Sequence, residues 1–253
     1  MTLRYRIKKE IVDVSKRAYV NMDPNNDRPD YDHLQIHDEY VGYDDVIYTP
    51  LDLPKVDVDL QSIYDKWDDP NMEEGTTAGT IAVGKVLFLK HNHFLHLDAD
   101  APYFDWALKD VPELCEWIDN LPFKTMRQCA FVQPPNLTPP HYDEPIYMTP
   151  HLREAAPAQY RIRWSNVTNT DNEIFYLSKD SGATKVYPVL PEGTQAYVYD
   201  GSVWEHGTDR GFKMNDRALI VMSGILDIPL HHALLDKSIT KYSDYVIRDK
   251  DIR

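Results

Sequence analysis

The chain has 253 residues, and its 27 basic residues against 41 acidic ones give a formal net charge of −14. A hydrophobic content of 42% is ordinary for a soluble globular protein, whereas the acidity disfavours a nucleic-acid binder, which needs a basic face. No stretch approaches the roughly 18 apolar residues that span a bilayer, and the first residues lack the apolar region of a signal peptide. Two cysteines, Cys115 and Cys129, are too few for a disulfide scaffold, so we expect a reduced, cytoplasmic protein. The length favours a single domain over 1–253.

Residues 1–80 are expected to form an acidic, irregular segment that wraps the rest of the chain. Twelve acids and two bases lie between positions 33 and 74, together with many Tyr and Pro residues. This composition is typical of a solvated acidic face, with an interaction surface for a basic partner as the alternative. Within it we predict a short strand at Val46–Tyr48, a helix at Leu60–Trp67 and a mobile loop at Asp68–Thr80.

Residues 81–228 are expected to hold the core, with mainly β structure and flanking helices. The apolar run Lys85–Lys90 predicts a buried strand, and 102–120 predicts two short helices that are separated at Pro112. Turn signals then separate seven predicted strands, at 125–133, 159–166, 173–177, 184–188, 195–199, 203–208 and 217–223. Many short strands at close spacing favour a sandwich or barrel. Residues 229–253 predict a C-terminal helix over Pro229–Lys237, followed by a tail.

One set of polar residues stands apart from the rest of the ten histidines. His141 and Asp143 form an H-x-D triplet after a Pro-rich turn, His206 follows in a predicted strand, and Arg217 begins the last strong strand. Residues i and i+2 of an extended chain point to the same side, so His141 and Asp143 can face one ion together. Two imidazoles and one carboxylate form the facial triad of non-haem Fe(II) oxygenases. An Arg deeper in the barrel can hold a carboxylate by a bidentate contact.

A second H-x-D triplet shows how often this pattern occurs by chance. His96 and Asp98 also follow an apolar strand, but they precede the helical pair and lie outside the β-rich half. We therefore prefer His141 and Asp143 as the metal ligands.

The order His141, Asp143, His206, Arg217 resembles that of Fe(II)/2-oxoglutarate-dependent dioxygenases. The likeness covers roughly residues 125–225, and the Arg-rich stretch Tyr160–Trp164 with the turn after it is closest to the aspartyl/asparaginyl β-hydroxylase and cis-proline hydroxylase branch. The resemblance implies a double-stranded β-helix (jelly-roll, cupin-like) core. It also implies Fe(II) bound by the two histidines and Asp143, and 2-oxoglutarate bound by Arg217 through its distal carboxylate.

Arg161 and Arg163 alternate with large apolar residues, so they share one face of a strand, which we expect to be the barrel interior. One of them is expected to help hold the cosubstrate; the alternative is a structural ion pair with the acidic segment. The implied reaction uses O2 and 2-oxoglutarate to hydroxylate a C–H bond of a small-molecule or peptidyl substrate, with amino-acid and peptidyl side chains preferred. Halogenation is disfavoured, because halogenating members of the family lack the carboxylate present at Asp143.

Two other classes of protein stay open. A cupin-type metal enzyme that does not use 2-oxoglutarate would share the barrel and the His ligands but would not need Arg217. A non-catalytic β-barrel binding module would instead use the acidic segment to recruit a basic partner.

Overall fold

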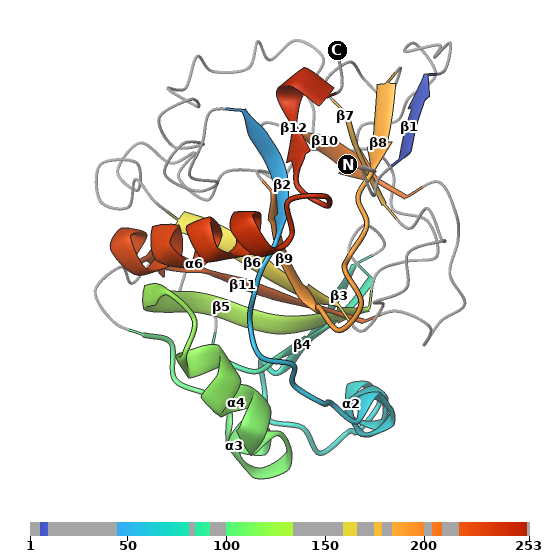
Figure 1. Ribbon diagram of the computed structural model, residues 1–253. Coiled ribbons are helices and arrows are strands. Elements are labelled where there is room, and N and C mark those ends of the chain that lie inside the picture. The colour runs from blue at the N-terminus through green and yellow to red at the C-terminus, as the bar shows by residue number, and fades with distance from the viewer. Residues whose placement is uncertain are drawn as a thin grey trace, which may run out of the picture.

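The computed structural model describes residues 6–9, 45–80, 84–91, 100–133, 159–165, 175–178, 184–199, 204–208 and 218–251. This part of the chain forms two antiparallel β-sheets with a few helices beside them, which confirms the mainly β class (Figure 1). None of the described helices combines the length and apolar character that crossing a membrane requires.

The larger sheet has eight strands within the described residues, all paired antiparallel. In spatial order they are β12 (Ile247–Arg248), β2 (Val46–Pro50), β9 (Ala196–Tyr199), β6 (Gln159–Ser165), β11 (Leu219–Leu226), β5 (Phe123–Gln133), β4 (Gly84–Phe88) and β3 (Thr77–Thr80). The smaller sheet consists of β1 (Arg6–Lys9), β8 (Thr184–Tyr187), β7 (Tyr176–Ser178) and β10 (Glu205–Gly207). Strands therefore pass repeatedly between the sheets, because β9 and β11 lie in the larger sheet and β10, between them in sequence, lies in the smaller one.

The helices are α2 (Leu60–Trp67), α3 (Asp105–Asp110), α4 (Pro112–Asp119) and α6 (Ile228–Lys241), and the 3-10 helix η3 (Asp249–Asp251) ends the described chain. The Asp59 side chain caps α2 by accepting hydrogen bonds from the backbone N–H groups of Gln61 and Ser62. Pro112 occupies the first turn of α4, where its missing N–H costs nothing, and α3 ends just before it. The predicted break between two helices at Pro112 is confirmed.

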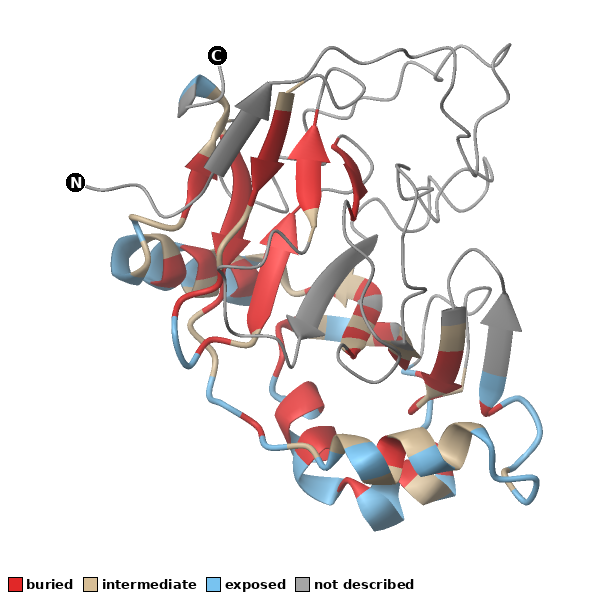
Figure 2. Cartoon of the chain, turned by 90° about the vertical axis from the view of Figure 1, so that its right-hand side faces the viewer, coloured by how far each residue is buried: buried red, intermediate tan, exposed pale blue. Residues whose placement is uncertain are grey.

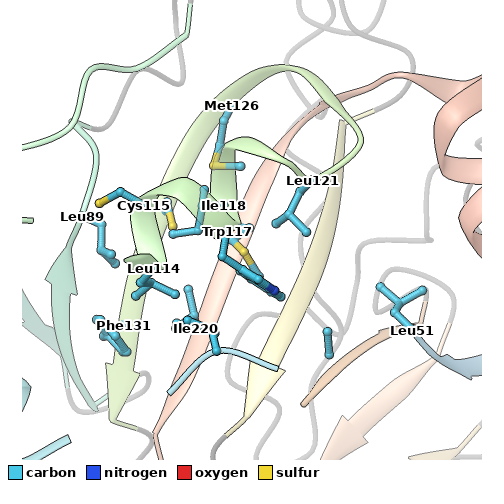
Figure 3. Close-up of a cluster of buried hydrophobic side chains, with 14 of the residues drawn as sticks. Leu51, Leu89, Leu114, Cys115, Trp117, Ile118, Leu121, Met126, Phe131 and Ile220 are labelled. Carbon is cyan, nitrogen blue, oxygen red and sulfur yellow. The ribbon is translucent and has the colours of Figure 1, made fainter. Parts of the chain in front are cut away.

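One hydrophobic cluster lies between the larger sheet and the helices. Its strand residues include Phe131, Ile220 and Met222, and its helix residues include Leu114 and Ile118, all of them buried. Figure 3 shows the buried side chains of α4 next to Phe131 and Ile220. A second cluster lies between the two sheets and combines Leu177 and Val186 of the smaller sheet with Tyr48, Tyr197 and Tyr199 of the larger one. Each face of the larger sheet is thus covered, and β9 is buried along its whole length (Figure 2).

The segment after β2 is attached to α6 through Asp52. Lys237 and Lys241 approach its carboxylate to 2.9 and 2.5 Å, and the backbone N–H of Asp52 donates to Ser238 Oγ at 2.9 Å. Burial alone would raise the pKa of the Asp52 carboxyl, but the hydrogen bonds and charges of the two lysines outweigh it and lower that pKa below 3.8. The path of the chain beyond β2 is therefore held by α6.

Two expectations about the acidic segment need correction. The loop predicted at Asp68–Thr80 is wrong over its last four residues, which form β3 by pairing with β4. The prediction that residues 33–74 lie outside the core is wrong at β2, where Val46, Ile47 and Tyr48 are at most 1% exposed. The partners of β2 are β9 and β12, both distant in sequence, so local composition does not reveal that β2 is buried. β3 instead pairs with β4, the next strand along the chain, and its Gly- and Thr-rich sequence is what suggested a loop.

Gly224 lies where β11 passes β5, next to a shift in their register. A Cβ atom there would lie 2.2 Å from the backbone oxygen of Thr125 and 2.9 Å from the Cα atom of Met126. Because both are backbone atoms, the steric clash with a Cβ can be relieved only if β11 and β5 move apart. We therefore expect Gly224→Ala to lower the free energy of unfolding by about 3 kcal/mol, measured by urea denaturation.

Gly193→Ala is the matched control for that change. Gly193 has a φ of +78° and no atom within 4 Å of its would-be Cβ, so only local backbone strain applies, about 1 kcal/mol. Equal losses of stability in the two variants would contradict the close approach of β11 and β5.

Candidate functional site

His206 lies in β10 and faces the space between the two sheets. Its Cα partner across the β7–β10 pair is Leu177, a fully buried member of the inter-sheet cluster. Residues that lie directly opposite in an antiparallel pair share one face of the sheet. His206 itself is 8% exposed. Of the predicted ligand residues, it is the one whose side chain the structure describes, and it lies on the inner face, as the metal hypothesis requires.

The ring of His206 has a polar contact and an aromatic contact that fix its orientation. Its Nδ1 atom lies 3.1 Å from the backbone oxygen of Trp204, and its plane meets the ring of Tyr199 edge-on at a centroid distance of 5.1 Å. Because a carbonyl oxygen only accepts hydrogen bonds, this contact requires the proton on Nδ1. In the neutral tautomer Nε2 then carries the lone pair, which is the arrangement of a metal-ligating histidine whose other nitrogen donates to a carbonyl.

Aromatic rings from β2, β9 and the residue before β7 surround this part of the inter-sheet space. Tyr197 and Tyr199 stack at 6.3 Å, Phe175 stacks on Tyr197 at 5.5 Å, and Tyr48 lies 5.7 Å from Tyr197. These rings form an apolar surface beside His206, which contacts it through Tyr199. Sequence reasoning missed the group, because its members alternate with other apolar residues and only the strand order brings them together.

The hydroxyl of Tyr48 is enclosed at the edge of this aromatic group. Tyr48 is fully buried, and its hydroxyl has no hydrogen-bond partner in the described part of the structure. Burial raises the pKa of Tyr48 well above 10, and the neighbouring Tyr197 raises it further. The group is therefore a neutral hydroxyl at physiological pH, able to donate a hydrogen bond but not to act as a base.

The register of β6 places Arg161 and Arg163 on one face of the larger sheet. Arg163 lies opposite Tyr197 on one side and Val221 on the other, and Arg161 lies opposite Ser223. Tyr197 belongs to the inter-sheet cluster, so these two positions lie on the face toward the smaller sheet. That their side chains face a barrel interior stays a prediction.

The other predicted site residues lie outside the described residues. These are His141 and Asp143, Arg217, and the alternative pair His96 and Asp98. Within the described ranges there is no group of three or more His, Cys, Asp or Glu residues that could hold a metal ion. The triad of His141, Asp143 and His206 thus stays a prediction, and so do the roles of Arg217, Arg161 and Arg163.

The two cysteines do not form a second reactive site. Both are free and buried. Burial, followed by the charge of Asp119, raises the pKa of the Cys115 thiol to about 11, and burial raises the pKa of Cys129 further still. Thiols that stay protonated at neutral pH are poor nucleophiles, so these cysteines serve the packing between α4 and the larger sheet.

Comparison with known proteins gives little further guidance. No protein-family model matches the chain. No curated protein matches it either. Among solved structures, the chain is similar to an oxidoreductase of the 2OG-Fe(II) oxygenase family from Burkholderia pseudomallei, with 11% identity and a TM-score of 0.34 over 65% of this chain and 78% of that one. A likeness of this size is too low to establish a shared fold or a shared activity.

Proposed function

We propose that the chain is a non-haem Fe(II) dioxygenase that couples decarboxylation of 2-oxoglutarate to hydroxylation of a C–H bond. The observation that carries the proposal is His206: it lies on the inner face of the smaller sheet, and the contact of its Nδ1 with the Trp204 carbonyl sets the tautomer in which Nε2 would be the ligand atom. Its place in the sequence order His141, Asp143, His206, Arg217 supports the same assignment.

The order of the strands supports a double-stranded β-helix core. In the larger sheet β9, β6, β11 and β5 are adjacent, and in the smaller sheet β8, β7 and β10 are adjacent. Going along the chain, β6 is followed by β7 and β8 in the other sheet, then by β9, β10 and β11 in alternate sheets. Such repeated crossing between two facing antiparallel sheets is the winding of a jelly roll.

In this function Fe(II) is held by His141, Asp143 and His206. Iron with 2-oxoglutarate and O2 supplies the oxidising power, and the protein supplies binding and orientation. The Trp204 carbonyl fixes the tautomer and ring orientation of His206. The aromatic rings on β2 and β9 keep water away from that histidine, which strengthens electrostatic contacts with an anionic cosubstrate.

The basic residues bind the cosubstrate. Arg217 holds the distal carboxylate of 2-oxoglutarate, and Arg161 or Arg163, on the inner face of β6, helps neutralise the second negative charge. An amino-acid or peptidyl side chain is the substrate that we infer, from the branch that the sequence resembles most. A single domain with a core over 81–228 and a cytoplasmic location complete the proposal.

The function is tested by adding Fe(II) and 2-oxoglutarate to the purified protein without oxygen. We expect a weak visible charge-transfer band that needs both components, because it arises from the cosubstrate chelating the iron. Fe(II) alone and 2-oxoglutarate alone are the controls. Iron binding without the band would indicate a cupin-type enzyme that does not use 2-oxoglutarate. Failure to bind iron would indicate a non-catalytic binding module.

A further inference from the structure

An open groove lies between α4 and the segment that leads from β2 to α2, far along the chain from His206. Its cavity volume is about 620 Å³. Figure 1 shows that segment descending from β2 beside α4. The apolar part of its lining includes Leu53, Val56, Trp117 and Leu121, and its charged part includes Glu113 and Glu116 of α4.

The groove is held in shape by hydrogen bonds on both of its sides. The indole N–H of Trp117 donates to the backbone oxygen of Pro54 at 2.8 Å, which joins α4 to the segment after β2. The backbone N–H of Val56 donates to the Gln195 side chain at 3.0 Å. An apolar side chain can therefore enter a preformed space without the cost of ordering its walls.

The charge around the groove is strongly negative. Glu113 and Glu116 lie three residues apart on α4, so they project from the same side of the helix, and neither forms an ion pair with any described residue. Lys55, the basic residue of the lining, is already paired with Asp57 at 2.7 Å. The lining as a whole holds three acids, Asp57, Glu113 and Glu116, against one base, Lys55.

We propose that this groove binds a basic polypeptide segment, in which an apolar side chain enters the groove and flanking Lys or Arg residues meet Glu113 and Glu116. Acidic peptides and nucleic acids would be repelled by the same carboxylates. A second copy of this chain would bring a like-charged surface against the groove in a symmetric dimer, which is also unfavourable. The proposal is independent of the dioxygenase function, because it uses no residue of the inter-sheet site.

Fluorescence anisotropy with labelled peptides tests this interaction surface on the full chain. The probe is a short lysine-rich peptide with a central pair of leucines, and the matched peptides carry serine in place of leucine or glutamate in place of lysine. We expect the first to bind and both matched peptides to bind at least about tenfold more weakly. A result in which the serine peptide binds equally well would overturn the proposal, because the groove would then play no part.

Variants of the protein distinguish peptide binding in the groove from a general attraction of the peptide to the acidic surface. Each exposed ion pair changes an equilibrium constant by up to about fivefold, so Glu113→Gln with Glu116→Gln should weaken binding by about tenfold. The control pair Glu73→Gln with Glu74→Gln removes the same charge from exposed positions outside the groove, and we expect less than a twofold change. Equal effects of the two pairs of substitutions on peptide binding would overturn the proposal. The proposal would also be overturned if light scattering showed that the parent protein is a dimer and that only the Glu113→Gln, Glu116→Gln variant is a monomer.

Discussion

His206→Ala is expected to abolish iron-dependent turnover and to weaken Fe(II) binding by more than about 100-fold, while the fold persists. Loss of a residue that merely orients a ligand costs about 10- to 100-fold in metal affinity, so loss of the ligand itself should cost more. The fold should persist because His206 lies in a three-residue strand at the edge of the smaller sheet, which pairs only with β7 among the described strands. Iron binding is measured by anaerobic titration, and folding by circular dichroism.

His231→Ala is the control for that experiment. His231 is also a buried histidine, but it lies in α6, on the opposite side of the larger sheet from the smaller one. We expect it to bind iron like the parent protein, even if it is less stable. The proposed metal site would be wrong if His206→Ala took up iron with the parent affinity, or if His231→Ala lost it instead.

Arg217→Ala is expected to raise the concentration of 2-oxoglutarate needed for half-maximal turnover about thirtyfold or more, with little change in iron affinity. A guanidinium inside a barrel is costly unless an anion meets it, and in the proposed function the distal carboxylate of the cosubstrate would be that anion. Removing one partner of such a desolvated charge pair costs about 2–5 kcal/mol. The measurement is a titration with 2-oxoglutarate, followed by succinate formation or by the visible band.

Arg217→Lys and Arg248→Ala complete the series. Lysine keeps the charge but cannot make the bidentate contact, so an intermediate effect is expected. Arg248 pairs with Asp45 at 2.6 Å near the C-terminus of the chain, and its loss should leave the 2-oxoglutarate dependence unchanged. If Arg217→Ala titrates like the parent protein, the cupin-type alternative becomes the better explanation.

The boundaries of the helices were predictable because local signals determine them. The helix predicted at Leu60–Trp67 is observed with the same bounds, since Asp59 supplies a cap and the apolar residues recur at helical spacing. Pro112 likewise ends one helix and begins the next. In α6 the prediction ended at Lys237, but the helix continues to Lys241, where a lysine bonds to Asp52 of a distant segment.

The number of strands after Lys124 was predictable from the sequence, but their first and last residues were less so. All seven strands expected after Lys124 are present, but the one expected at 173–177 is described from Tyr176 to Ser178 and the last one continues to Leu226. Strand ends depend on where a partner strand begins and stops, and that partner is distant in sequence. The same dependence hid the buried position of β2, whose partners are β9 and β12.

By itself, the sequence determined the elements and the list of candidate ligands, because spacing and residue type are local properties. It predicted that Arg161 and Arg163 share a face, since alternation along a strand requires it. Only the tertiary structure set the register that places Arg163 opposite Tyr197, and only the tertiary structure turned His206 toward Tyr199 between the sheets. The reason is that the inner side of a strand is set by strand order and register, which arise from hydrogen bonds between segments far apart in the chain.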